Sequence, residues 1–199
     1  MSAQSFIDPP PVTPEVQAMY DADQADRGFV MNLSTVWSHQ PATKQGLMDL
    51  LAQCGAAGGL TMRQRAILVT ACASTLGDSY CSLAWGAKLV EEADAVTAGA
   101  VLRGDDGSLD DGDRALARWA RQLVRDPNAT TPADVQALRD AGFDEGQVVA
   151  LTVFAALRLA FSTVNDALGI HPDAGLLPPL PPEVRDAVTY GRPVAAPAG

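Results

Sequence analysis

The sequence has few of the residues that build metal centres or disulfide frameworks. Its 199 residues include three cysteines and two histidines. The cysteines, Cys54, Cys72 and Cys81, are odd in number and irregularly spaced, which argues against a disulfide framework and a zinc motif. His39 and His171 are the only histidines, and no Gly-x-Ser-x-Gly elbow is present, so a Ser-His-Asp hydrolase is disfavoured. We expect neither a metal nor a cofactor.

Positive charge is scarce as well. Lys and Arg number 14 against 24 Asp and Glu, which gives a formal net charge of −10, and the basic residues form no run. Because nucleic acids and anionic membranes are bound through clustered Lys and Arg, we expect neither as a partner. No window of about 20 residues is uniformly apolar, and the N-terminal segment lacks the pattern of a signal peptide. A cytoplasmic location is therefore expected.

What the chain does contain is helical periodicity. Apolar residues recur three and four positions apart, with capping residues, prolines and glycines at the boundaries. No alternating strand pattern is present, so the predicted fold class is all-α, with about eight to ten helices. The expected helices cover residues 13–26, 29–39, 41–55, 61–77, 78–90, 96–103, 110–124, 131–142, 145–168 and 183–190.

One helical domain fits the 20.8 kDa mass and the 47% hydrophobic content, which suffice for a core without disulfides. Residues 1–12 are rich in proline and predict an extended N-terminal arm. Residues 13–192 form the predicted helical domain. Residues 193–199 are a short Pro/Ala segment that we expect to be a loose C-terminal tail.

The predicted helix 145–168 is apolar on nearly every side, which is typical of a helix buried centrally or between subunits. Its exceptions, Arg158, Ser162 and Asn165 or Asp166, share one face. Because a buried arginine needs a partner, one interpretation is an internal ion pair or a subunit contact. The other is that these polar groups line a pocket.

The stretch Gly77–Gly86 carries the most chemically suggestive residue. Cys81 stands just inside a predicted helix start, behind Asp78 or Ser79 as the cap. The N–H groups at a helix start favour a thiolate and lower the pKa of a cysteine there. The stretch has no second cysteine, no histidine and no lysine before Lys88. It therefore predicts the location of a site more clearly than an activity.

Five stretches stand in a characteristic order along the chain: Gly28–Asn32, Leu60–Arg65, Asp78–Cys81, Leu138–Phe143 and Asn165–Gly169. Their order and spacing resemble the AhpD-like family, which groups alkylhydroperoxidase AhpD with carboxymuconolactone decarboxylase, and in particular its peroxidase-related branch. The resemblance runs from about Val12 to Arg192. It implies an all-α AhpD-like bundle that assembles into trimers, or hexamers built from them.

Active members of this family carry a Glu, a Cys-x-x-Cys and a His at fixed spacing. One thiolate attacks the peroxide, the other cysteine resolves the sulfenic acid as a disulfide, and Glu and His move protons. By this resemblance the Glu position is Ala66, the first cysteine position is Asp78, the second is Cys81, and the His position is Trp85. The resemblance therefore implies a degenerate motif that keeps a single cysteine.

Two hypotheses follow from that loss. In the first, the chain is a catalytically inactive AhpD-fold oligomer that acts as a binding or structural protein, with Asp78 as a helix cap, Cys81 buried and Trp85 packed. In the second, Cys81 is a thiol peroxidase residue that an external thiol reduces. Asp78 is able to accept a proton, but its negative charge raises the pKa of the nearby thiol. The candidate catalytic residues are Cys81 and Asp78, and the candidate pocket residues are Trp85, Ser82, Arg158 and Asn165.

A carboxymuconolactone decarboxylase-like lyase acting on a small carboxylate is a third hypothesis. Such a ligand needs convergent cations, for which Arg63, Arg65 and Arg158 are the candidates. The favoured interpretation of the first two is a solvated helix face. The remaining residues are interpreted as bystanders: His39 and His171 on the surface and in a turn, Cys54 and Cys72 as packing residues.

Overall fold

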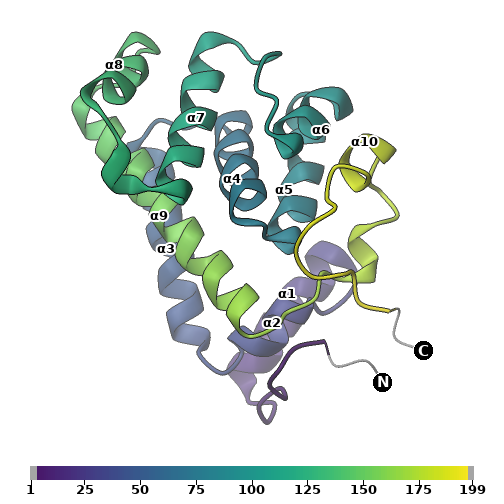
Figure 1. Ribbon diagram of the computed structural model, residues 1–199. Helices are drawn as coiled ribbons and strands as arrows, with labels where there is room; N and C mark the ends of the chain where they lie inside the picture. Colours follow the sequence, from purple (N-terminus) through teal and green to yellow (C-terminus); the bar gives the residue numbers. More distant parts are fainter. Residues whose placement is uncertain (1–3, 197–199) are drawn as a thin grey trace.

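Every regular element in residues 4–196, the part of the chain that this computed structural model describes, is a helix, which confirms the predicted all-α fold (Figure 1). Two of these elements, η1 (Pro127–Ala129) and η2 (Ala174–Leu176), are short 3₁₀ helices. The α-helices are α1 (Pro14–Arg27), α2 (Asn32–Trp37), α3 (Pro41–Ala57), α4 (Met62–Leu76), α5 (Ser79–Glu92), α6 (Ala95–Arg103), α7 (Asp111–Arg125), α8 (Pro132–Asp140), α9 (Glu145–Ala167) and α10 (Pro182–Arg185).

Helix α4 is the centre of the structure, with α7 and α5 packed on either side of it (Figure 1). Its residues from Ala66 to Ala73 are all buried. Thr61 and Gln64 form a capping box at its start, and Gly77 ends it with a left-handed φ of 87°. Because that conformation favours glycine, the chain can turn sharply there and pass into α5.

Helix α9 is buried on one side only within the single chain, so it is not the central helix, and burial between subunits, the other expectation for it, stays a prediction. It packs along α3 and against α4, α7 and α8, and this covers residues such as Leu151 and Phe154. Val149 and Val153 are 64% and 41% exposed. Within the described residues, α9 also has the length and apolar composition of a membrane-crossing helix, a property shared by core helices of soluble proteins.

Two helices are shorter than predicted because long-range contacts hold their ends. The segment expected from residue 29 becomes helical only at Asn32, whose backbone N–H donates to Asp173 Oδ1 at 2.9 Å. The helix expected over 183–190 ends at Arg185. The chain then turns so that the Tyr190 hydroxyl donates to Ser82 Oγ at 3.0 Å.

The two chain ends meet beside the C-terminal end of α9. The backbone N–H of Phe6 donates to the carbonyl of Leu168 at 2.9 Å, and the Arg192 guanidinium lies 4.7 Å from the centre of the Phe6 ring. In the C-terminal segment, Ala195 N–H donates to the carbonyl of Pro172 at 2.8 Å. The outermost parts of the predicted arm and tail, residues 1–3 and 197–199, lie outside the described residues.

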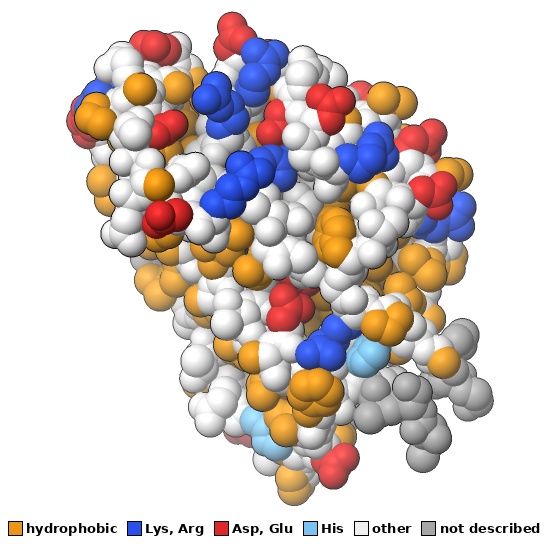
Figure 2. All heavy atoms as spheres, viewed as in Figure 1, with side chains coloured by type: hydrophobic (Ala, Val, Ile, Leu, Met, Phe, Trp, Pro, Cys, Tyr) orange, Lys and Arg blue, Asp and Glu red, His pale blue; other side chains and the backbone are white. Residues whose placement is uncertain are grey.

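On the face of the molecule shown in Figure 2, basic side chains fall in separate groups among acidic and apolar ones. Hydrophobic side chains also reach the surface on the side where α3 and α9 lie. Leu50 of α3 and Val149 and Val153 of α9 are among the exposed apolar residues.

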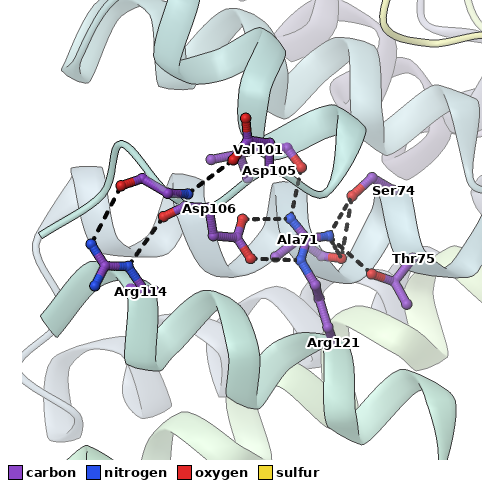
Figure 3. Close-up of polar contacts among 9 residues, drawn as sticks. Ala71, Ser74, Thr75, Val101, Asp105, Asp106, Arg114 and Arg121 are labelled. Carbon is purple, nitrogen blue, oxygen red and sulfur yellow. Dashed lines mark hydrogen bonds and ion pairs between the residues drawn. The ribbon is translucent and has the colours of Figure 1, made fainter. Parts of the chain in front are cut away.

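A buried ion pair joins α4 and α7 to the loop after α6 (Figure 3). The Arg121 guanidinium of α7 donates to both carboxylate oxygens of Asp106, from Nε at 2.9 Å and from Nη2 at 2.8 Å. The same Nη2 donates to the carbonyl of Val101 at 2.7 Å. On its other side, Nη1 donates to the hydroxyls of Ser74 and Thr75 at 3.1 Å each. The guanidinium is therefore paired by charge and by hydrogen bonds.

Replacing Asp106 with Asn leaves Arg121 buried without its counter-ion. We expect the free energy of unfolding, measured by urea denaturation, to fall by about 3 kcal/mol, because breaking one side of a buried pair strands a charge. Asp111→Asn is the matched control, since it removes the exposed ion pair to Arg114 and should change the free energy by less than about 1 kcal/mol. Equal effects of the two substitutions would contradict this role of the buried pair.

Candidate functional site

The turn between α4 and α5 places Cys81 at the start of a helix. Asp78 is the N-cap of α5, and its Oδ1 accepts the backbone N–H of Cys81 at 2.9 Å. Both residues are buried, with Cys81 2% exposed and Asp78 wholly enclosed. The predicted cap is thus present, and the cysteine lies in the first turn of α5, inside the protein.

Two donors from α9 point at the Cys81 sulfur. Arg158 Nη2 donates to Sγ at 3.5 Å, and the Ser162 hydroxyl donates to Sγ at 3.6 Å. The two residues are one helical turn apart, as predicted from their spacing on one face. The structure therefore brings Cys81, Arg158 and Ser162 together from α5 and α9.

Burial decides the protonation state of Cys81. Removal from water raises the pKa of this thiol far above its usual value, and the negative charge and hydrogen bond of Asp78 raise it further. The positive charge of Arg158 and the hydrogen bond from Ser162 act in the opposite direction but do not prevail. Cys81 is therefore a neutral thiol at physiological pH, despite its place at a helix start.

Arg158 has aromatic neighbours where the sequence suggested an acidic partner. Its guanidinium carbon lies 5.1 Å from the ring centres of both Trp85 and Phe161. Among the described residues it forms no ion pair, so the interpretation as an internal salt bridge is wrong. Its Nε is buried and has no hydrogen-bond partner. Within the described residues, this buried positive charge therefore has no carboxylate within 4.0 Å.

Trp85 stands between this buried charge and the surface. It is half-buried, and it lines an open cleft of about 500 Å³ together with Met62 of α4, Lys88 of α5 and Arg27 of α1. Its ring is thus both a neighbour of Arg158 and part of the cleft wall.

The other two candidate pocket residues hold neighbouring segments in place. Ser82 Oγ accepts the hydroxyl of Tyr190. Asn165 Oδ1 accepts the indole N–H of Trp37 at 2.8 Å, and its Nδ2 is buried without a partner. Ser82 therefore ties α5 to the C-terminal segment, and Asn165 ties α9 to α2.

Sequence reasoning missed the contribution of the C-terminal segment to the site. The hydroxyl of Ser79 donates to the backbone carbonyl of Arg192 at 2.8 Å, and Arg192 Nη2 donates to the carbonyl of Asp166 at 2.8 Å. Burial and the charge of Asp78 raise the pKa of Asp166 to about 6, while Arg192 lowers it. No local pattern signals contacts between residues so far apart in the chain.

The candidate cations Arg63 and Arg65 both have structural partners. Arg63 is not on a purely solvated face, because its Nε pairs with the buried carboxylate of Asp113 at 2.8 Å. Arg65 Nε donates to the carbonyl of Leu60 at 3.1 Å.

Cys72 is buried and Cys54 is half-buried. The histidines contact backbone carbonyls, His39 that of Asp8 and His171 that of Pro193. Residues 4–196 hold no cluster of three or more His, Cys, Asp or Glu able to bind a metal.

No family model and no curated protein matches the sequence, but solved structures match the fold. A peroxidase-related protein from Ralstonia eutropha JMP134, described as an alkylhydroperoxidase AhpD core, superimposes with a TM-score of 0.76 at 21% identity over 88% of this chain and 96% of its own. The chain has the AhpD-core fold. A peroxidase-related protein from Silicibacter sp. TM1040 gives a TM-score of 0.75 at 19% identity, over 87% and 94% of the two chains.

The AhpD-core likeness confirms the architecture expected from the resemblance, an AhpD-like helical bundle. At these identities it establishes the fold and leaves the activity to be argued from the residues. In this fold the turn between α4 and α5 carries Asp78 and Cys81, and α9 supplies the donors that face the sulfur.

Replacing Asp78 with Asn tests the effect of charge on this thiol. Asn keeps an oxygen for the helix cap and removes the negative charge, so the pKa of Cys81 should fall and its alkylation by iodoacetamide should speed up, by about tenfold per pKa unit. Peptide mass spectrometry at pH 8 measures the rate at Cys81 and at the half-buried Cys54.

In the unmodified protein we expect Cys54 to react before Cys81, because Cys81 is enclosed. The matched control is Asp144→Asn, which changes the N-cap of α9 in the same way and should leave the rate at Cys81 unaltered. An unchanged Cys81 rate in the Asp78 variant would show that Asp78 does not set the pKa of the thiol.

Proposed function

We propose that the protein is a peroxidase-related member of the AhpD-like family that lacks dithiol peroxidase chemistry and serves as a non-catalytic, homo-oligomeric binding protein of the cytoplasm. The observation that carries this proposal is the state of Cys81. Its sulfur is enclosed, burial and the charge of Asp78 raise its pKa, and by the resemblance Asp78 takes the position at which the family's catalytic cycle needs the other thiol.

The chemistry of the dithiol cycle explains why these replacements matter. A thiolate attacks the peroxide and a neighbouring thiol then closes a disulfide. Asp78 cannot form a disulfide, and the indole of Trp85 has no proton to exchange near neutral pH. Burial raises the pKa of Cys72 to about 12, and this cysteine is itself enclosed on α4. The site therefore has neither the thiolate nucleophile nor the second thiol and proton-transferring groups that the cycle requires.

A one-cysteine thiol peroxidase is the second candidate, and the two donors aimed at Cys81 favour it. Arg158 and Ser162 would stabilise a thiolate and a sulfenic acid at this sulfur, which an external thiol would reduce. The enclosed sulfur and the charge of Asp78 weigh against this candidate. The lyase hypothesis has less support, because Arg63 pairs with Asp113 and Arg65 with a backbone carbonyl.

The exposed apolar side of α9 supports the oligomeric part of the proposal. Val149 and Val153 lie one helical turn apart on it, and Leu50 of the adjacent α3 is also exposed. Exposed apolar side chains on two neighbouring helices are what a contact surface between subunits would bury. We propose that this surface joins subunits in a trimer, or in a hexamer built from trimers.

The peroxide reaction tests the non-catalytic proposal directly. We expect the purified protein with excess dithiothreitol to consume hydrogen peroxide or cumene hydroperoxide no faster than the thiol alone, in a ferrous xylenol orange assay. Cys81→Ser should leave that rate unchanged. Sulfenic acid at Cys81, trapped with dimedone, together with a Cys81-dependent rate would contradict the proposal and favour the one-cysteine peroxidase.

Size-exclusion chromatography with light scattering tests the oligomer. We expect the unmodified protein to elute as a trimer or hexamer of the 20.8 kDa chain, and Val153→Asp to shift it to monomer, because a charge in an apolar interface is unpaired and desolvated. Val96→Asp is the control, since Val96 is 66% exposed on α6, a helix that lies apart from α3 and α9 (Figure 1). A monomeric unmodified protein would overturn the oligomer proposal.

A further inference from the structure

Two buried arginines in this protein have opposite surroundings. Arg121 and Arg158 are 5% and 6% exposed. Arg121 has a bidentate carboxylate partner, two hydroxyls and backbone carbonyls around its guanidinium (Figure 3). Arg158 has one hydrogen bond to a neutral sulfur, two aromatic rings and an unpartnered Nε. The same side chain at the same depth is fully paired in one place and unpaired in the other.

Asp78 is close to the same cysteine as Arg158, but its carboxylate does not pair with the guanidinium. Asp78 shares Cys81 as a neighbour with Arg158, but the two do not form an ion pair within 4.0 Å. The Asp78 carboxylate instead caps α5: its Oδ1 accepts the N–H of Cys81 near the positive end of the helix dipole, and its Oδ2 is buried without a hydrogen-bond partner. Two cation–π contacts only partly replace the counter-ion that a buried arginine requires.

Further unused donors lie along the same face of α9. Arg158 contributes Nε, Ser162 contributes a hydroxyl held only by a weak sulfur contact at 3.6 Å, and Asn165 contributes a buried Nδ2 without a partner. These residues are spaced one turn apart, so their donors share one side of the helix. Buried donors without partners are rare in native proteins and point to a missing acceptor.

We propose that Arg158 binds a small planar anion of carboxylate shape, with its oxygens on the Nε–Nη2 edge of the guanidinium and beside the Ser162 hydroxyl. A planar anion with two oxygens matches that edge in a bidentate manner. The proposal deepens the function proposed above and rests on it, because it names the class of ligand for the same site. Cys81 stays a neutral thiol that forms one wall, and no bond to the ligand is made or broken.

Trp85 lies on the route by which the ligand would reach Arg158. Its ring lies 5.1 Å from the Arg158 guanidinium carbon and also lines the open cleft of about 500 Å³. Rotation of this half-buried side chain would join the cleft to the charged edge of Arg158. Lys88 and Arg27 in the cleft wall attract anions, although Glu91 and Asp26 there reduce the net charge. The enclosed position of Arg158 favours the smallest anions, of which formate is the simplest probe.

The test compares the melting temperature of the folded protein in sodium formate and in sodium chloride at equal ionic strength. We expect formate to raise the Tm of the unmodified protein by about 5 °C once its concentration is about 100-fold above the dissociation constant. Arg158→Met should abolish this formate-specific rise. In chloride alone its Tm should equal or exceed that of the unmodified protein, because the substitution removes an uncompensated charge and keeps the volume.

Arg185→Met is the matched control, because Arg185 is exposed on α10 and the change in net charge is the same. It should keep the formate-specific rise. Equal Tm values in formate and chloride for the unmodified protein, or an equal formate-specific rise in the Arg158 variant, would overturn the proposal.

If the Arg158 variant does not fold, isothermal titration of the unmodified protein with formate decides the question. A saturable heat supports the anion site, and its absence overturns it. These readouts are separate from the peroxide assay. Peroxide consumption would contradict the proposed function without altering the Tm comparison, whereas a missing formate effect would remove the anion site and leave the non-catalytic proposal standing.

Discussion

The bidentate pair of Arg121 with Asp106 is the interaction on which the arrangement of the central helices depends. It brings the ends of α4 and α6 and the middle of α7 to one point inside the protein. A buried charge pair is expensive to desolvate, so its full set of partners fixes where these helices sit. With α4 placed in this way, the turn at its end carries α5, and with it Cys81, into contact with α9.

Opposing electrostatic effects act on Cys81, and their magnitudes decide its chemistry. A helix start and the guanidinium of Arg158 both favour a thiolate. Enclosure in the core and the carboxylate of Asp78 both disfavour it, and they prevail. The same location that activates a cysteine in one environment therefore keeps it neutral in another. What distinguishes the two environments is access to water and the charge of the residue at the cap.

The site is assembled by segments that are distant in sequence. The C-terminal segment closes over α5 through Tyr190 and Arg192, and the N-terminal arm reaches the end of α9 through Phe6. The C-terminal contacts cover the first turn of α5, where Cys81 lies. An enclosed group of polar atoms that lack partners differs from an ordinary apolar core, and this difference motivates the interpretation as a binding site.

The sequence by itself determined the helices and several of their caps, and it predicted the stretch that carries Asp78 and Cys81 as the candidate site. Helix periods and glycine turns are local, so Thr61, Gly77 and Asp78 could be interpreted without knowing their neighbours. Tertiary structure alone decided that α4, and not α9, is the enclosed helix. It also decided that Arg158 faces the Cys81 sulfur and two aromatic rings and forms no ion pair with a carboxylate. Burial, and therefore charge compensation and pKa, depends on packing between distant segments, which no local pattern encodes.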